Sequence, residues 1–267
     1  MDLIVCIPTF NEELNIKKCL NKLKWANKVI ILDSNSTDNT VKIAKKFKNT
    51  NIIYSKKKLS YVSKLNYFIN KNKGKWLLIL DADYVLSNAL IKEFKILHIK
   101  NLRKEKISGF KIKIYNKIFN KTIREDIYPK KILLFKNVNC YFRQFGHSEK
   151  FFIKGKISNI DGYIMQENFN EIKNFSVWKL NQSKYSKLDS SRIVKTKFDE
   201  LRTQDKIRKF PPINIILIMI YFIFFKKILI YGKSGFFYLF QRLFYETLLS
   251  FQIIKIYLRK FKNFISL

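Results

Sequence analysis

The feature that most constrains this chain is a short apolar run, Trp76–Leu80, followed by two carboxylates at Asp81 and Asp83. A run this short and this apolar predicts a buried parallel strand rather than a helix. Asp81 and Asp83 are two residues apart, so on an extended chain they point to the same side. Open α/β sheets bind ligands at the edge where their parallel strands end. Two adjacent carboxylates there suit a hard divalent cation with its phosphates; the alternative is a loop Asp pair that caps the next helix and binds nothing.

A second apolar run, Leu3–Ile7, carries no charge and predicts the first strand of the chain. Asn11 is a favourable helix N-cap. Glu12 and Glu13 would then lie in the first helical turn, where negative charge suits the helix dipole. Apolar positions at helical spacing continue through Leu23. The segment therefore predicts a strand followed by a helix that begins at Asn11.

The same plan repeats at Val29–Leu32, which predicts a strand that ends at Asp33, and at Ser36–Asp38, which would open the next helix. Right-handed crossovers between parallel strands bring successive strand ends to one edge of the sheet. Asp33, Asp81 and Asp83 are therefore expected to converge at that edge. The fold class predicted from this pattern is α/β, with a mixed, mainly parallel sheet flanked by helices.

Four further segments show clear local patterns. Leu59–Asn70 has the apolar spacing of a helix, and Ser87 is a favourable N-cap for a helix that continues to residue 98. Ile107–Phe119 alternates Lys with Ile, Tyr or Phe, which predicts a strand with a basic outer face. Ile132–Phe135 predicts one more strand.

Three segments in this order, Pro8–Glu12, Asp33–Thr40 and Leu80–Asp83, resemble the motifs of family 2 glycosyltransferases, which have the Rossmann-like GT-A nucleotide-sugar fold. Each motif alone is weak, but the three together at these intervals are specific. Within the family, the Asp33–Thr40 segment and the later segment Phe145–Glu149 are similar to lipopolysaccharide-core and capsule glucosyltransferases. The resemblance implies an inverting transfer of a hexose, with glucose as the expected sugar, from a nucleoside diphosphate (UDP first) to an acceptor hydroxyl.

The resemblance also implies a role for each carboxylate. Glu12 and Asp33 are expected to face the nucleoside, because carboxylates accept hydrogen bonds from base N–H groups and ribose hydroxyls. Asp81 is expected beside the ribose and diphosphate, and Asp83 is expected to bind Mg²⁺ or Mn²⁺. Such a metal bridges the diphosphate oxygens and neutralises charge on the leaving group. Glu149 is the expected general base; the alternative is a glutamate on a surface loop.

Three more residues complete the expected site. Thr9 and Asn66 are assigned to the nucleotide, and Asn66 is the position of Lys64–Asn66 that matches the family's Gln-Arg/Lys-Asn run. His147 follows Gly146, which suits a tight turn. It is expected to bind metal or phosphate, or to orient the general base. At Gln166 the family often has a His, so this chain departs from the pattern there, and a degenerate transferase stays open.

The formal net charge is +33, from 53 Lys and Arg against 20 Asp and Glu. This balance normally indicates nucleic acid or an anionic membrane, although the abundance of Lys, Asn, Ile and Phe is also typical of an AT-rich genome. No nucleic-acid module is recognised, and the basic residues are spread along the whole chain, so no nucleic-acid partner is expected. The alternative from a different class is a non-enzymatic protein that binds RNA or anionic lipid, but that function would not explain carboxylates at strand ends.

Cys6, Cys19 and Cys140 form no disulfide framework, so buried free thiols and a reducing compartment are expected. The N-terminus lacks the pattern of a signal peptide. The expected location is therefore the cytoplasmic face of the plasma membrane.

The chain is expected to divide into a GT-A domain over 1–210 and an apolar, basic helical tail over 211–267. The run Ile213–Phe225 is shorter than the roughly 20 apolar residues of a spanning helix, and a second helix is expected from Phe236 to Phe261. We expect this hairpin to lie in the membrane interface with its cations at the lipid head groups. The alternatives are a helical pair that closes the core or a dimer, and a true span through Ile213–Tyr231.

A membrane-held enzyme with a basic surface suits an anionic, lipid-linked acceptor such as a lipopolysaccharide inner core. Transfer to a polyprenyl phosphate or to a capsule intermediate is the alternative within the same class.

Overall fold

The computed structural model describes residues 3–55, 59–99, 106–124, 127–167 and 175–265. The chain forms two compact units. The first contains Met1–Lys117, Asp126–Arg143 and Lys150–Asn168, and the second contains Ile118–Glu125, Gln144–Glu149 and Phe169–Leu267.

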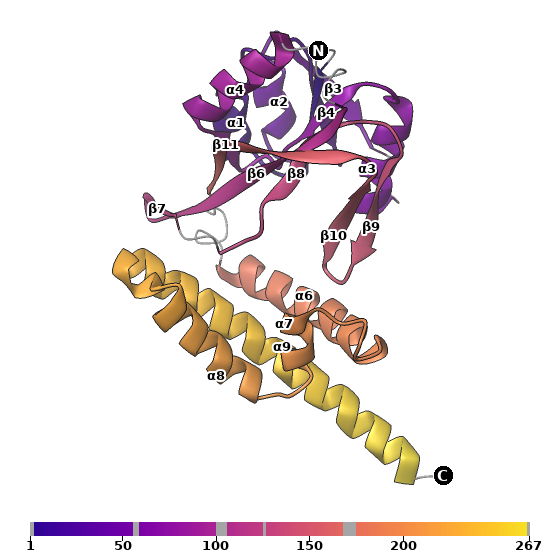
Figure 1. The fold of residues 1–267 in the computed structure, drawn as a ribbon, viewed down its shortest axis with the longest axis vertical. Coiled ribbons are helices and arrows are strands. Elements are labelled where there is room, and N and C mark those ends of the chain that lie inside the picture. The colour runs from indigo at the N-terminus through magenta and orange to yellow at the C-terminus, as the bar shows by residue number, and fades with distance from the viewer. Residues whose placement is uncertain (1–2, 56–58, 100–105, 125–126, 168–174, 266–267) are drawn as a thin grey trace. The chain divides into compact units, whose positions relative to one another are not determined.

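The first unit is built on one large mixed sheet (Figure 1). Strands β3, β2, β1 and β4 are adjacent in that order and parallel. Strand β8 is antiparallel to both β4 and β6, and β11 is parallel to β6 but antiparallel to β5. The strands along the main path of this sheet are β1 (Leu3–Thr9), β2 (Val29–Asp33), β3 (Thr50–Tyr54), β4 (Trp76–Ile79), β5 (Tyr84–Leu86), β6 (Ile107–Ile118), β8 (Lys131–Lys136) and β11 (Lys156–Glu167). The predicted α/β fold with a mainly parallel sheet flanked by helices is confirmed.

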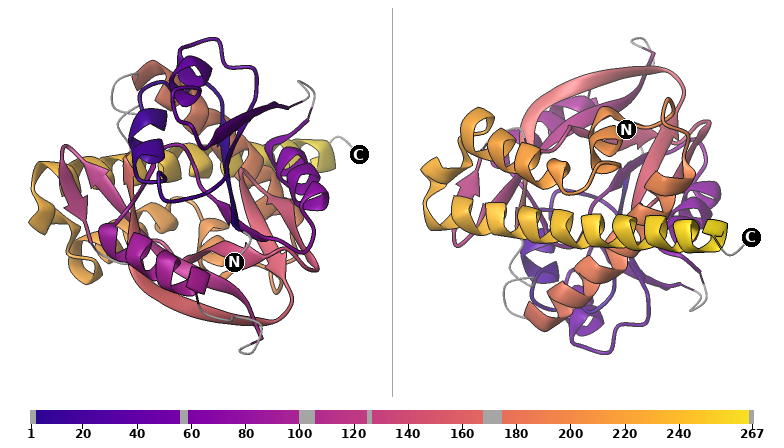
Figure 2. Two further views of the ribbon diagram at one scale, coloured as in Figure 1. Left: turned by 90° about the horizontal axis from the view of Figure 1, so that it is seen from above. Right: turned by 90° about the horizontal axis from the view of Figure 1, so that it is seen from below.

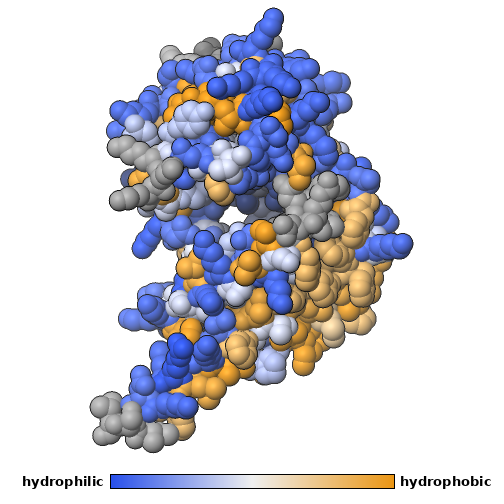
Figure 3. Space-filling model, turned by 180° about the vertical axis from the view of Figure 1, so that it is seen from behind, coloured by the Kyte–Doolittle hydropathy of each residue, from blue (hydrophilic) through white to orange (hydrophobic). Residues whose placement is uncertain are grey.

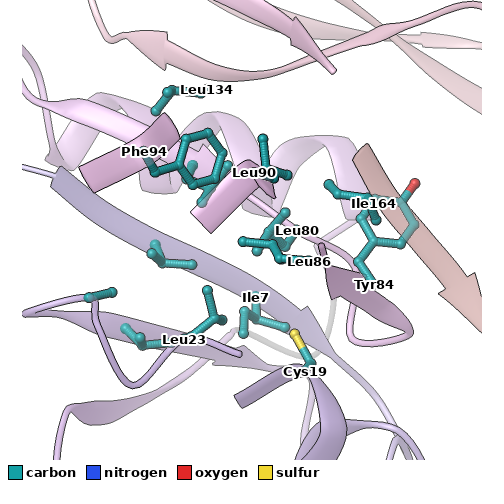
Figure 4. Close-up of a cluster of buried hydrophobic side chains, with 14 of the residues drawn as sticks. Ile7, Cys19, Leu23, Leu80, Tyr84, Leu86, Leu90, Phe94, Leu134 and Ile164 are labelled. Atoms are coloured by element: carbon teal, nitrogen blue, oxygen red, sulfur yellow. The ribbon is translucent and has the colours of Figure 1, made fainter. Parts of the chain in front are cut away.

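The two faces of this sheet carry separate cores because successive side chains of a strand point to opposite faces. On β1, Val5 and Ile7 pack with helices α1 (Ile16–Asn21), α2 (Thr40–Ala44) and α4 (Asn88–Ile99). Figure 4 shows part of this cluster. Ile4 and Cys6 pack instead with helix α3 (Tyr61–Lys71). Strands β1, β2 and β4 are therefore covered on both faces, as their unbroken apolar runs require.

Local signals placed most of these elements correctly. Ser60 and Ser87 cap α3 and α4, since their Oγ atoms accept hydrogen bonds from the backbone N–H of Ser63 (3.1 Å) and Leu90 (3.2 Å). The predicted strand over 107–119 is β6, and its alternate residues are buried.

The prediction that a helix begins at Asn11 is wrong. Asn11 has a φ of 56°, and α1 begins at Ile16. Glu12 and Glu13 lie before the helix, where their backbone N–H groups donate to Thr40 Oγ1 (2.7 Å) and Asp38 Oδ2 (3.1 Å). Hydrogen bonds to the loop after β2 thus replace the first turn of the expected helix.

The second unit consists mainly of helices (Figure 2). Helix α9 runs along both α6 and α8. Trp178 of α6 lies against Phe244 of α9, with ring centroids 5.0 Å apart. The elements are β7 (Lys121–Ile123), α6 (Phe175–Lys195), α7 (Thr203–Arg208), α8 (Ile213–Ile220), the π-helical turn η1 (Tyr221–Phe225), the 3₁₀ turn η2 (Ile228–Tyr231) and α9 (Lys233–Ile265).

The helices expected after residue 210 are present. The compact unit that contains them also includes α6 and α7, so it begins earlier in the chain than the expected boundary between residues 210 and 211. The apolar run from Ile213 is divided into α8, η1 and η2 rather than forming one helix. None of the helices in the described part of the chain combines the length and the apolar character needed to cross a membrane.

Strands β9 (Cys140–Phe145) and β10 (Ser148–Ile153) form a separate two-stranded sheet. All three cysteines are free thiols, as predicted. Cys6 and Cys19 are fully buried and Cys140 is half-buried.

Candidate active site

Three carboxylates of the first unit influence one another electrostatically. Burial, and then the neighbouring charges of Asp81 and Glu12, raise the pKa of Asp83 to about 8. Burial is also the main reason that the pKa of Glu12 is raised, with smaller contributions from Asp81 and Asp38. Glu12 follows β1, whereas Asp81 and Asp83 follow β4, so the fold brings these two strand ends together. The site carries an excess of negative charge that a cation would relieve.

The Asp81–Asp83 turn is held by neighbouring groups. The backbone N–H of Tyr84 donates to the carbonyl of Asp81 (3.0 Å), and the Tyr61 hydroxyl donates to Asp81 Oδ1 (3.1 Å). Gln166 Nε2 donates to Asp83 Oδ2 (3.0 Å). The family often has a His at the position of Gln166. The residue that departs from the family pattern therefore lies beside the expected metal ligand, Asp83.

Asp33 belongs to a different hydrogen-bonded group. Its carboxylate is fully buried, and Oδ1 accepts from Thr9 Oγ1 (2.8 Å) and Ser36 Oγ (2.6 Å). Oδ2 accepts from the backbone N–H of Ser36 (2.8 Å). Asp33 and Thr9 therefore tie the end of β1 to the loop after β2, and their expected contacts with a nucleoside stay a prediction.

Asn66 is paired with the backbone of β9. Its Nδ2 donates to the carbonyl of Phe142 (2.8 Å), and its Oδ1 accepts from the N–H of Phe142 (2.8 Å). Through these two hydrogen bonds, Asn66 holds β9 against α3. Lys64, two residues earlier, reaches the loop after β2, where its Nζ donates to Ser34 Oγ (2.8 Å). The sequence analysis did not assign Lys64 to the site.

The donor set around Asp83 fits a metal that is shared with a substrate. Within the described ranges, no three or more His, Cys, Asp or Glu side chains are arranged to hold a metal ion by themselves. Mg²⁺ is commonly held by one or two carboxylates, with substrate phosphates and water as its other ligands. Asp83 and Asp81 could supply those carboxylates, and the two charged neighbours that raise the pKa of Asp83, Asp81 and Glu12, are both negative.

His147 is oriented by a buried aspartate in the second unit. Asp189 is only 4% exposed; its Oδ2 lies 2.6 Å from His147 Nδ1 and also accepts a hydrogen bond from the Tyr245 hydroxyl. The backbone N–H of His147 donates to Asp189 Oδ1 (3.0 Å). Burial alone would raise the pKa of Asp189, but the hydrogen bond and charge of His147 outweigh it and lower the pKa. His147 is thus bonded to Asp189 and not to Glu149.

Gly146 makes this contact possible. Its φ is 63°, which favours glycine, and a Cβ atom added there would lie 1.8 Å from Asp189 Oδ1. Glu149 is partly exposed on β10, in the same unit as His147. Glu149 and His147 were expected to act at the same site as Asp81 and Asp83, and this stays a prediction.

A chain of buried ion pairs continues from this group. Arg192 pairs with Asp205 (3.0 Å), and Asp205 with Arg208 (3.0 Å). Arg208 and Arg242 both pair with Glu246, which has no exposed surface. The network joins α6, α7 and α9 inside the second unit. Sequence patterns could not reveal it, because its members come from separate helices and share no local spacing.

Residues 4–153 match the sequence model of the family described as "Glycosyl transferase family 2". The chain is 41% identical over 87 residues to the SPbeta prophage-derived glycosyltransferase SunS of Bacillus subtilis, a match that covers 32% of this chain and 21% of SunS. It is 32% identical over 108 residues to the uncharacterized glycosyltransferase MG060 of Mycoplasma genitalium, with 36% of each chain covered. This chain therefore spans only a minor part of either relative.

Among solved structures, the fold is similar to that of the mannosyltransferase PcManGT from Pyrobaculum calidifontis, in complex with GDP-Man and Mn²⁺. The TM-score is 0.56 at 11% sequence identity, over 95% of this chain and 87% of PcManGT. At this identity the likeness shows the fold alone.

Proposed function

This chain belongs to glycosyl transferase family 2, and from that premise we propose that it transfers a hexose from a nucleoside diphosphate to a hydroxyl of a lipid-linked surface glycan. The observation that carries the donor side of this proposal is the group formed by Glu12, Asp81 and Asp83, in which burial and neighbouring charge raise the pKa of Asp83 to about 8. Carboxylates whose pKa is raised by burial and by neighbouring negative charge are typical of functional sites. A divalent cation with the diphosphate would offset their charge.

Asp83 and Asp81 would hold Mg²⁺ or Mn²⁺ in this site. The complex of PcManGT with GDP-Man and Mn²⁺ supports a metal in enzymes of this fold. When bound, the metal would neutralise charge on the departing diphosphate. The chain's own residues would position the ligands: Tyr61 by its hydrogen bond to Asp81, and Gln166 by its hydrogen bond to Asp83.

The proposed reaction is a single displacement with inversion. The bond from the anomeric carbon to the diphosphate oxygen breaks while the acceptor oxygen bonds to that carbon, and the acceptor proton passes to Glu149. A positioned general base contributes about 10²–10⁴-fold to such a step. His147, held by Asp189, would bind a phosphate of a substrate.

The proposed donor is a UDP-sugar, with glucose as the first sugar to test. The proposed acceptor is an anionic glycan on lipid, such as a lipopolysaccharide inner core, at the cytoplasmic face of the plasma membrane. The net charge of +33 supports an anionic acceptor. A polyprenyl phosphate or a capsule intermediate offers similar chemistry and belongs in the same panel of acceptors.

Isothermal titration with UDP-glucose, with and without Mn²⁺, tests the donor site. We expect binding that depends on Mn²⁺ and that Asp83→Ala abolishes. The matched control is Asp199→Ala, which removes an exposed carboxylate of the second unit and should leave binding unchanged. If no nucleotide sugar binds while RNA binds tightly in a salt-sensitive way, the non-enzymatic alternative is favoured. Hydrolysis of a panel of nucleotide sugars would then identify the sugar.

A further inference from the structure

We propose that the second unit docks on an anionic lipid bilayer through one face of its α8–α9 hairpin. Large apolar side chains are exposed along α8, η1 and η2, with Phe224, Phe225 and Ile230 exposed by 69%, 75% and 66%. Figure 3 shows apolar side chains gathered over the helical unit. We define the apolar face by Ile213, Leu217, Ile220, Phe224, Phe225 and Ile230.

Helix α8 and the turn η1 that continues it have two sides with large apolar residues, and only one of these sides packs inside the unit. Asn214, Ile218 and Phe222 recur every four residues and are buried. Asn214 Oδ1 accepts a hydrogen bond from Ser250 of α9 (3.0 Å), and the ring of Phe222 lies 5.5 Å from that of Tyr238. This side therefore packs on α9.

The other side of the same helix is exposed. Ile213, Leu217, Ile220 and Phe224 are spaced by four, three and four residues, which places them on one stripe. Because the opposite side already packs on α9, the fold does not need this stripe for its core. A contiguous exposed apolar patch is typical of an interaction site.

The charge around the apolar face identifies the partner. Residues 206–267 contain eleven Lys and Arg but a single acidic residue, Glu246. Glu246 has no exposed surface and is bonded to Arg208 and Arg242. The exposed surface of α8 and α9 therefore carries cations without carboxylates, and Lys227 and Lys233 are exposed beside the apolar face. An anionic bilayer offers both an apolar layer and a plane of negative head groups.

The dimensions of the hairpin favour a helix that lies in the interface. Helix α8 has eight residues and is therefore about 12 Å long, against a hydrocarbon core of about 30 Å. Phe224 and Phe225 stand at its end, immediately before Lys226 and Lys227. Phenylalanines beside lysines are suited to insertion just below the head groups, with the ammonium groups at the phosphates.

This inference does not depend on the proposed function. The apolar face belongs to the second unit, whereas Asp81 and Asp83 belong to the first. Vesicle binding and nucleotide binding can therefore fail separately, and both are measured on the full chain.

Co-sedimentation with vesicles tests the proposal. We expect the full chain to bind vesicles of phosphatidylcholine mixed with phosphatidylglycerol more tightly than vesicles of phosphatidylcholine alone. Phe224→Ser with Phe225→Ser should weaken binding by about tenfold or more, since each ring loses its burial. Lys227→Gln with Lys233→Gln should weaken binding to the anionic vesicles by about tenfold and leave binding to phosphatidylcholine unchanged.

The matched control is Tyr67→Ser with Ile96→Ser, which removes two apolar side chains of the first unit that are each 52% exposed. Its binding should equal that of the unchanged chain. Melting curves recorded in parallel confirm that each variant is folded. The proposal is overturned if the unchanged chain does not bind anionic vesicles. It is also overturned if the phenylalanine variant binds these vesicles as tightly as the control variant does. It is also overturned if the apolar face instead joins two copies of the chain, seen as a dimer in lipid-free sedimentation that the phenylalanine variant dissociates.

Discussion

Removing the charge of Asp83 should stabilise the fold at neutral pH while it abolishes metal-dependent donor binding. Burial, Asp81 and Glu12 raise the pKa of Asp83 from 3.8 to about 8, so the ionised carboxylate is disfavoured in the folded state. One pKa unit corresponds to ~1.4 kcal/mol, so the shift from 3.8 to about 8 sets an upper bound of roughly 6 kcal/mol. The gain is smaller than this bound because a buried Asn amide also costs free energy to desolvate. Asn keeps the size of Asp and can still accept the hydrogen bond from Gln166. We expect Asp83→Asn to raise the free energy of unfolding by about 2 kcal/mol at pH 8.

The pH dependence of this gain has a definite sign. The unfolded carboxyl titrates near 3.8 and the folded one near 8, so the folded state holds the extra proton between these values. The stability that protonated Asp83 contributes is fully present below about pH 4 and is lost as the pH rises through about 8. The advantage of Asp83→Asn should therefore be near zero at about pH 4 and largest above about pH 8.

Urea unfolding at a series of pH values, in the absence of divalent cations, measures this advantage. Asp199→Asn, which changes an exposed carboxylate, is the control for general charge effects. Adding Mn²⁺ and UDP-glucose should stabilise the unchanged chain, because a ligand that binds only the folded state raises its stability, and should not stabilise Asp83→Asn. A gain that is absent at pH 8, or equal at low and high pH, would refute the argument that Asp83 is a desolvated acid among like charges.

Three further changes test other parts of the structure. Glu149→Gln should lower kcat by about 10²–10⁴-fold in a transfer assay while titration shows unchanged donor binding; equal losses in both would contradict its assignment as the base. Gly146→Ala should destabilise the fold by about 2–4 kcal/mol, because its Cβ would meet Asp189 Oδ1 at 1.8 Å; a melting temperature equal to that of the unchanged chain would count against this geometry. Glu246→Ala should cost about 3–5 kcal/mol in urea unfolding, because Arg208 and Arg242 both lose the buried carboxylate that they share. Glu200→Ala, at an exposed position, is the comparison and should be near neutral.

Strands β1, β2 and β4 could be predicted from sequence because they are buried on both faces. Such strands have short runs without charge, and the runs at 3–7, 29–32 and 76–80 correspond to β1, β2 and β4. Helix starts were predicted where a side chain caps its own helix, as Ser87 does. The prediction at Asn11 failed because Thr40 and Asp38, far along the chain, bind the backbone that would have formed the first turn.

The candidate site was predictable where its residues sit next to strand ends. Asp81 and Asp83 follow β4 directly, and the structure brings Glu12 close enough to help raise the pKa of Asp83. Asn66 was expected at the nucleotide, but its amide pairs with Phe142, and a contact between residues so distant in sequence leaves no periodic signal. Asp189 could not be predicted for the same reason, because it contacts His147 only in the folded chain.

The buried cysteines make the native chain nearly inert to thiol reagents, which is useful for labelling. Burial raises the pKa of both Cys6 and Cys19, so the reactive thiolate is scarce at neutral pH. Burial raises the pKa of Cys140 to about 11 as well, and its Sγ donates to Asn137 Oδ1 (3.2 Å). A cysteine introduced at an exposed position would therefore carry a fluorophore or spin label selectively, without first removing the three natural thiols. Substituting such a cysteine for Phe225 would make an environment-sensitive dye report lipid contact directly.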